Sequence, residues 1–483
     1  MDVLAAQLAA VSDWITLHIT MWVLVGTGIL LTVRTGFVQL RRLPDMFRQV
    51  AGSRSGAQGG ISSFQAFTIS LAARVGIGNV FGVAAALILG GPGAIFWMWV
   101  VALVGMATAF FEATLAQMFK VRHTDGSFRG GPAYYMARGM RSRPLGVAFA
   151  GLTIFTCGFS IIMVQSNAVA GVIGPDSPLH LPPSAAAAVL VGLSALVILG
   201  GVRRVARVTE WMAPIMALVY VVMAVVIVAL HITQLPGIMV TIISSAFGPV
   251  PFAGGVTGGI IAALTNGTRR GLFSNEAGEG SVPNIAATAT VPHPVQQGFV
   301  QSLGVFVDTI LVCTATGLLI LLATNTYHPG DDSLVGAILT QQAVAEHLGA
   351  WTTWPMVVLI FVLVFSTVLG CYSYAQVNVN FLGGERRAEQ VFGIVLTVAA
   401  FGGTVLTLPI VWALTDIALG LLGVLNLVVI VRLAPWVIGA LRDFESQRAR
   451  GITEPAFVGH GNSLLPGDVV PGIWEPDDVA KRG

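Results

Sequence analysis

The sequence predicts an all-α integral membrane protein, and three observations support that prediction. The chain of 483 residues is 55% hydrophobic and only 10% charged, far below the roughly one quarter of charged residues usual in soluble domains. Its mean hydropathy is +0.82. Apolar runs of about 20 residues, the length that crosses a hydrocarbon core of roughly 30 Å, recur along almost the whole chain. We therefore expect a lipid bilayer to surround most of it.

Eleven apolar runs are long enough to be membrane spans. They lie near residues 13–33, 66–90, 93–119, 146–172, 184–202, 209–231, 254–285, 297–323, 353–381, 388–406 and 410–431. The first run follows Met1 and Asp2 without a basic leader or a cleavage pattern, so we expect an anchor and not a removable signal peptide.

These runs divide the chain into four parts. We predict an extra N-terminal helix over 1–34, five spans over 66–231, five more over 254–432, and a mobile cytoplasmic tail over 451–483. The tail contains Pro, Gly and acidic residues without a period, which is typical of segments that form no core.

Basic residues test the number of spans, because cytoplasmic loops are enriched in Lys and Arg. Alternate loops and the tail, starting after the first span, hold 22 of the 25 Lys and Arg residues, and the other loops hold none. The remaining three, Arg74, Arg269 and Arg270, fall inside spans. This distribution predicts an odd number of spans, with the N-terminus outside and the C-terminus in the cytoplasm.

The net charge of +2 gives no indication of a nucleic-acid partner.

Two spans carry clusters of Gly and polar residues, LAARVGIGNVFG at 71–82 and NGTRRGLFSNEAGEG at 266–280. An unpaired backbone amide in hydrocarbon costs several kcal/mol, so a Gly-rich break persists only where protein, water or a ligand satisfies it. Gly also serves simply to pack membrane helices closely, but the polar neighbours favour a binding site. We therefore predict that both helices are interrupted, at 76–79 and at 273–278.

The positions of the two breaks predict an internal symmetry. Each break lies in the first span of a group of five, and because five is odd, the second group enters the membrane in the opposite direction. Inverted repeats with paired discontinuous helices are typical of secondary transporters. The N-termini of half-helices attract a carboxylate, and freed carbonyls at the opposite ends coordinate a small cation.

Five longer motifs have a specific order along the chain. They are ARVGIGN (73–79), GGPGAIFWMWVVALVGMAT (90–108), GGPAYYM (130–136), RRGLFSNEAGEGS (269–281) and QGFVQSLGVFVDTILVCTATG (297–317). Together they resemble the alanine or glycine:cation symporter family, also called the sodium:alanine symporter family, over roughly residues 15–435.

The resemblance implies a LeuT-type fold with one additional N-terminal helix. It also implies a secondary active transporter of a bacterial inner membrane that couples sodium to symport of a small neutral amino acid, alanine or glycine foremost, by alternating access. Two alternatives remain open: a proton-coupled amino-acid transporter of the same fold, and a relative with a larger amino-acid substrate.

An amino-acid zwitterion needs donors for its carboxylate, acceptors for its ammonium and a small apolar pocket for its side chain. We assign the carboxylate to the first break, through Gly76, Ile77, Gly78 and Asn79. We assign the ammonium to carbonyls of the second break, around Phe273, Ser274 and Asn275. Phe273 is also a candidate wall of the side-chain pocket.

A sodium ion is the co-transported partner that the resemblance implies, and no other cofactor is expected. By similarity to LeuT-type transporters, its ligands are the carbonyls of Ala72, Val75 and Leu363 and the hydroxyls of Ser366 and Thr367. The spacing supports the hydroxyls only weakly, because Ser and Thr in membrane helices often bond to their own helix.

Charged side chains inside a membrane are functional candidates because their burial is expensive. Arg74 stands beside the first break, where it could pair with Glu276 or Asp308 and brace the second break. Alternatively, one of these acids carries a proton in place of the ion. Glu112 and Asp416 are further embedded acids, and we place Glu112 near the cytoplasmic end of its span.

Several positions depart from the pattern expected of the family. Ile77 replaces a Thr, Glu279 a Leu, and Cys371 a Trp, and Gln376 stands in place of a Glu. Loss of a Trp beside the binding site would enlarge it, which favours a larger substrate or altered coupling.

Other classes of function fit the sequence less well. The three Cys residues lie in apolar runs, which is not the pattern of a disulfide framework or a zinc site. The sequence contains neither HExxH nor GxSxG, so we do not expect an enzyme. A channel would need a continuous polar stripe along its spans, which the sequence does not show.

Overall fold

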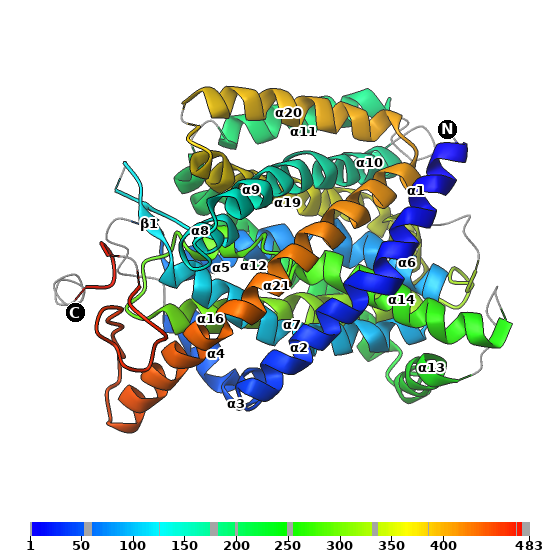
Figure 1. Cartoon of the computed structure of the whole chain (residues 1–483). Coiled ribbons are helices and arrows are strands. Elements are labelled where there is room, and N and C mark those ends of the chain that lie inside the picture. The colour runs from blue at the N-terminus through cyan, green and yellow to red at the C-terminus, as the bar shows by residue number, and fades with distance from the viewer. Residues whose placement is uncertain are drawn as a thin grey trace.

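The computed structural model describes residues 2–52, 60–124, 126–173, 182–198, 201–248, 255–330, 337–384, 386–469 and 471–475. Within these ranges the chain is almost entirely helical (Figure 1). A small antiparallel hairpin of β1 (Val121–Arg122) and β2 (Phe128–Arg129) is the one sheet in this described part. The predicted all-α class is confirmed.

The helices of the first half are α1 (Asp2–Ile15), α2 (Met21–Arg34), α3 (Val38–Arg41), α4 (Leu43–Gly52), α5 (Ser63–Arg74), α6 (Val83–Gly90), α7 (Gly93–Met118), α8 (Pro132–Arg138), α9 (Arg143–Phe155), α10 (Ile161–Ile173), α11 (Pro183–Ile198) and α12 (Gly201–Leu230). Those of the second half are α13 (Leu235–Phe247), α14 (Gly255–Asn275), α15 (Pro283–Ala286), α16 (Pro294–Val305), α17 (Thr314–Leu322), α18 (Ala337–Leu348), α19 (Thr353–Phe381), α20 (Arg386–Val405) and α21 (Leu408–Ala449). Four π-helical segments, η1 (Thr16–Thr20), η2 (Gly78–Gly82), η3 (Thr156–Ser160) and η4 (Phe306–Cys313), and the 3₁₀ turn η6 (Ala350–Thr352) join some of these helices.

Seven helical stretches of the described chain are long and apolar enough to cross a membrane. They are Val3–Arg34, Gly93–Met118, Arg143–Ile173, Arg203–Leu230, Pro294–Leu322, Ala350–Phe381 and Leu408–Ala449. An eighth is the bent pair Ser63–Arg74 and Gly78–Gly90. The chain is thus a multi-pass membrane protein, whereas the count of eleven, the two groups of five and the LeuT-type fold stay predictions.

Helix α7 lies at the centre of the molecule and packs against α14, α16, α2 and α21. Small residues allow this close packing: a Cβ on Gly298 of α16 would collide with the Thr114 hydroxyl of α7. The interrupted helix α5 packs against α12, α19 and α16. In Figure 1, α21 crosses one face beside α1 and α2, and α11 and α20 pair at one edge. Both interruptions are therefore enclosed by other helices.

The first interruption lies at Val75 and Gly76, between α5 and η2, where the helix axis bends by 46°. A side chain on Gly76 would collide with the Thr367 hydroxyl, and a Cβ on Gly78 would lie 3.0 Å from the Phe273 ring. Glycine is needed here because other helices approach the backbone. The break begins one residue earlier than predicted, and Gly78 and Asn79 already belong to η2.

The second interruption begins after Asn275, the last residue of α14. Glu276, Gly278 and Gly280 all have left-handed φ angles, of 53°, 88° and 81°. The predicted start at Phe273 is three residues too early, because the helix persists until the backbone turns left-handed at Glu276. The chain then enters the short helix α15.

The described part of the tail packs against the helices, unlike the mobile extension predicted for 451–483. The rings of Phe457 and Trp474 lie 5.4 Å apart and both are buried. The Trp474 Nε1–H donates to the carbonyl oxygen of Gln117 at the end of α7, at 3.0 Å. Aromatic burial and this hydrogen bond hold the segment in place.

Candidate functional site

A small cavity lies between the two interruptions. Seven of the predicted site residues line it: Arg74, Gly76, Ile77, Gly78, Phe273, Glu276 and Thr367. Its empty space is about 280 Å³, of which about 10 Å³ is open to the centre of a water molecule, so it holds roughly one water. The structure therefore shows a nearly closed site.

Residues outside the predicted set complete the cavity wall. Ala73 comes from α5, Ile161 and Gln165 from α10, Leu419 from α21 and Glu279 from the second interruption. Gln165 and Leu419 gave no signal in the sequence, because each is a single residue in an otherwise apolar span. Cys371 is buried but is not among the described lining residues, so its small size does not enlarge this cavity.

Asn79 and Ser274 join the two interruptions and do not line the cavity. The Asn79 side chain accepts from the Gly76 N–H at 2.9 Å and donates to Ser274 Oγ at 3.0 Å and to Asp308 Oδ1 at 2.7 Å. Ser274 and Thr309 both donate to Asp308 Oδ2, at 2.8 and 2.7 Å. Asp308 on η4 is thus a buried acceptor that fixes both breaks.

Asn275 also lies away from the cavity and stabilises the start of the second interruption. Its Oδ1 accepts from the Ala277 N–H at 2.9 Å. We therefore find three of the predicted substrate residues, Asn79, Ser274 and Asn275, in positions that shape the breaks.

The predicted ion ligands meet where α19 crosses the end of α5. Ser366 Oγ donates to the Ala72 carbonyl at 2.9 Å and to the Leu363 carbonyl at 2.7 Å. Thr367 Oγ1 lies 3.2 Å from the Ala73 carbonyl and 3.1 Å from that of Leu363. These uncharged oxygens form one cluster, to which Ala73 was not predicted to contribute. Within the described residues, neither Ser366 nor Thr367 donates to the Val75 carbonyl.

Arg74 is 2% exposed and does not form the predicted ion pair. Its Nη1 donates to the Gln301 carbonyl on α16 at 3.2 Å. Over the described residues, no carboxylate oxygen of Glu276 or Asp308 lies within 4.0 Å of its guanidinium, and its Nε and Nη2 lack hydrogen-bond partners. The reason is the close approach of α16, where a Cβ on Gly304 would collide with Arg74 Nη1.

The two acids of the second interruption differ in their contacts. Glu276 Oε2 accepts from Ser281 Oγ at 2.8 Å, so this side chain is tied to its own loop. Glu279 is fully buried, and neither of its carboxylate oxygens has a partner among the described residues. Most buried polar groups in proteins are hydrogen-bonded. Glu279, in the cavity wall, is therefore an unusual acceptor without a partner.

Glu112 on α7 braces the second interruption from behind. It is 1% exposed, accepts from the Gly278 N–H at 3.3 Å and accepts from Asn426 Nδ2 at 3.0 Å. Asn426 Nδ2 also donates to the Gly278 carbonyl at 2.9 Å, and Tyr135 donates to Asn426 Oδ1. Backbone groups of the left-handed loop hold this buried carboxylate, and its expected place near the cytoplasmic end of its span stays a prediction.

A layer of aromatic and charged side chains closes the cavity on the side where α14 begins. Phe273 contacts the Trp412 ring at a centroid distance of 4.6 Å, and the Arg270 guanidinium lies 4.1 Å from the same ring. Arg270 Nη2 is 2.8 Å from Asp416 Oδ2. Arg269 pairs with Asp13 at 2.5 Å. The sequence marked these charges as embedded but gave no sign of their pairing, because the partners are far apart along the chain.

Comparison with known proteins places this chain in a family. Residues 1–458 match the sequence pattern of a family described as "Sodium:alanine symporter family". The amino-acid carrier protein AlsT of Bacillus subtilis is 42% identical over 467 residues, covering 96% of this chain and 97% of AlsT. The probable sodium/glutamine symporter GlnT of the same organism is 41% identical, covering 90% and 89% of the two chains.

The sodium/alanine symporter AgcS of Methanococcus maripaludis is 38% identical over 431 residues, covering 88% of this chain and 94% of AgcS. The names of all three relatives describe carriers or symporters, and none describes an enzyme. This chain is accordingly a membrane transport protein and not an enzyme, and it belongs to the sodium:alanine symporter family.

Proposed function

We propose that this chain carries a small neutral amino acid across a bacterial inner membrane together with sodium, by alternating access. One observation carries the proposal: Thr367 both lines the cavity between the two interruptions and belongs to the hydroxyl–carbonyl cluster beside it. A substrate and an ion would therefore bind in adjacent places. The relative AgcS is named a sodium/alanine symporter, which supports the same pair of cargoes.

The proposed substrate position follows from the wall of the cavity. The first N–H groups of a helix lack intrahelical partners and favour a carboxylate, and Ile77 and Gly78 stand at the start of η2. Gln165 Oε1 is a buried acceptor without a partner among the described residues and is a candidate for the ammonium, with the carbonyls near Phe273. The confined space favours glycine or alanine over larger amino acids.

The proposed ion position is the cluster of Ala72, Leu363, Ser366 and Thr367. Its oxygens are uncharged, which suits a monovalent cation that must also leave. We also propose that the carbonyl of Val75 joins this cluster.

For the whole chain we propose a LeuT-type arrangement of eleven spans, with one extra helix followed by two groups of five. The N-terminus would then lie outside and the C-terminus in the cytoplasm.

Uptake into proteoliposomes tests this proposal. Radiolabelled alanine or glycine should accumulate with an inward sodium gradient and should stop when potassium replaces sodium. A Ser366→Ala variant should need more sodium for half-maximal uptake, while a Ser446→Ala variant in the exposed end of α21 should not. Uptake that is indifferent to sodium would contradict the proposal.

Proton coupling is the second candidate, and Glu279 favours it. A fully buried carboxyl whose two oxygens lack partners in the described structure is a natural place for a proton. A related Bacillus subtilis protein is named a putative sodium/proton-dependent alanine carrier. Uptake driven by a pH gradient without sodium, and abolished by Glu279→Gln, would support this candidate over the first.

A further inference from the structure

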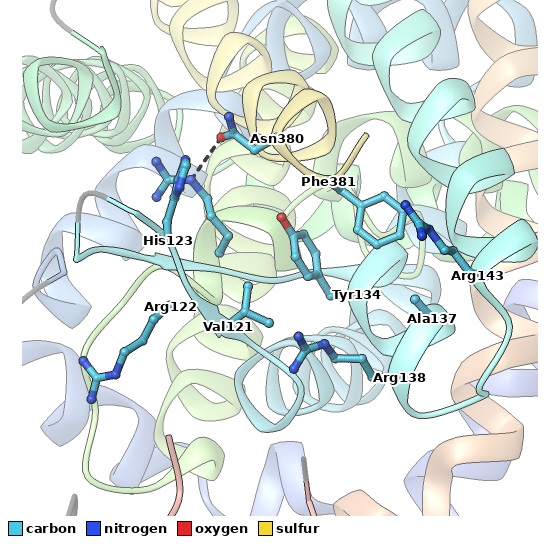
Figure 2. Close-up of a pocket in the computed structure, with 10 residues that line it drawn as sticks. Val121, Arg122, His123, Tyr134, Ala137, Arg138, Arg143, Asn380 and Phe381 are labelled. Carbon is cyan, nitrogen blue, oxygen red and sulfur yellow. Dashed lines mark hydrogen bonds between the residues drawn. The ribbon is translucent and has the colours of Figure 1, made fainter. Parts of the chain in front are cut away.

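A second, larger pocket lies at the opposite end of the broken helices from the aromatic layer. It is formed by the β1–β2 hairpin, α8, the first residue of α9 and the end of α19, and its volume is about 450 Å³. Figure 2 shows the side chains that surround it. Five basic residues line it: Arg122, His123, Arg129, Arg138 and Arg143. Among the described lining residues none is acidic, so the pocket has the character of an anion site.

Three donors of this pocket have no partner within the described chain. Neither Arg138 nor Arg143 makes a side-chain hydrogen bond or an ion pair there. Tyr134 is only 8% exposed, and its hydroxyl likewise has no hydrogen bond to a described residue. Arg138 and Arg143 are exposed, so these two guanidinium groups and the Tyr134 hydroxyl are donors that a ligand entering the pocket can reach.

The protonation states of these donors fit the same interpretation. Burial raises the pKa of Tyr134 to about 12, so the hydroxyl keeps its proton and remains a donor. Partial burial lowers the pKa of the Arg138 guanidinium, and no described carboxylate pairs with it. An anion in the pocket would restore the lost solvation.

The pocket stands at the level where helices leave the membrane. The candidate span Arg143–Ile173 begins at its rim, and the candidate span Ala350–Phe381 ends at it. It also lies on the Arg-rich side, which the distribution of basic residues assigns to the cytoplasm. Basic pockets between helices at such a surface are suited to anionic head groups.

We propose that this pocket binds a phosphate-bearing anion, either the head group of an anionic phospholipid or a soluble phosphate. Two guanidinium groups and a hydroxyl can approach the tetrahedral oxygens of a phosphate from different directions, whether it is a phosphodiester head group or free phosphate, whereas the two oxygens of a carboxylate lie in one plane. Arginine donors match phosphate oxygens in bidentate pairs. The chemistry of the donors therefore selects phosphate over carboxylate.

Binding there would connect the pocket to the candidate ion site. Tyr134 contacts the Phe381 ring at 5.0 Å, and Arg129 Nε donates to Asn380 Oδ1 at 3.1 Å, so α8 and β2 already meet the end of α19. The same helix carries Ser366 and Thr367. An anion bridging Arg138 on α8 and Arg143 on α9 would fix these two helices beside the end of α19 and favour the conformation described here.

The test uses the purified full chain and native mass spectrometry with phosphatidylglycerol and phosphatidylcholine. Wild type should retain phosphatidylglycerol in preference, and Arg138→Gln/Arg143→Gln should weaken retention about tenfold or more, as expected for loss of charged hydrogen bonds. The matched control, Arg34→Gln/Arg48→Gln, removes the same charge from α2 and α4 and should retain the lipid.

A second arm distinguishes the two sources of phosphate. If the ligand is soluble, inorganic phosphate should raise the unfolding temperature of wild type in phosphatidylcholine alone, and the pocket variant should lose that rise. Tyr134→Phe keeps charge and ring packing and should weaken binding severalfold, which decides the matter if the double variant does not fold. Equal binding of both probes by the pocket and control variants, or by Tyr134→Phe and wild type, would overturn the proposal.

Discussion

Replacing Asn79 with Ala should destabilise the protein and abolish transport, because one amide holds both interruptions. The side chain accepts from the Gly76 N–H at 2.9 Å and donates to Asp308 at 2.7 Å and Ser274 at 3.0 Å. Truncation leaves the Gly76 N–H and one Asp308 oxygen buried and unpaired. Each such neutral group costs about 1–3 kcal/mol, and a charged one more, so we expect a loss of about 3–5 kcal/mol.

The assay combines thermal unfolding in detergent with uptake into proteoliposomes. The matched control is Asn167→Ala, because Asn167 donates to two backbone carbonyls, of Gly403 and Leu406, at 2.9 and 3.2 Å. Asn167 is only partly buried, so water can replace it and the loss should be about 1 kcal/mol. The reasoning fails if Asn79→Ala unfolds no earlier than Asn167→Ala and still takes up alanine.

Three further predictions concern the layer of aromatic and charged side chains around Arg270, the proposed ion cluster and the C-terminal tail. Arg270→Gln and Asp416→Asn should each open the site on the side where α14 begins, seen as faster labelling of an introduced cavity cysteine; the double variant should cost less than the sum, since breaking a buried pair leaves one charge unpaired. Equal labelling of the variants and the parent would contradict this. Thr367→Ala should raise the sodium concentration needed for half-maximal uptake and should lower the unfolding temperature only slightly. An unchanged sodium dependence would exclude Thr367 from the ion site. Trp474→Ala should lower stability by about 3 kcal/mol, the cost of deleting a buried aromatic side chain, and a loss below about 1 kcal/mol by thermal unfolding would show that the tail is not held.

The start of the first interruption was predictable from sequence to within one residue, but its end was placed too late, because Gly78 and Asn79 belong to η2. Gly76 and Gly78 stand there because Thr367 and Phe273 approach the backbone, and clustered glycines in an apolar run are visible without coordinates. The second was placed three residues early. Phe273 and Ser274 are compatible with a helix, and only the left-handed φ of Glu276 shows where α14 ends.

The partners of charged groups could not be predicted, because they depend on how distant helices approach. Arg74 meets a carbonyl of α16 and not the acids chosen for it, since α16 comes close enough at Gly304 to occupy the guanidinium. Glu112 reaches a backbone N–H of the second interruption for the same kind of reason. Hydropathy locates such residues in the membrane, but it contains no information on which helices touch.

The hydroxyls of Ser366 and Thr367 already occupy the carbonyls of Ala72, Ala73 and Leu363 with their own protons. A cation that enters must exchange with these hydrogen bonds, and when it departs they close again without help. If the proposed ion site is this cluster, its own hydrogen bonds keep the interrupted helix intact between cycles and limit how tightly the ion is held, which favours rapid release over long residence.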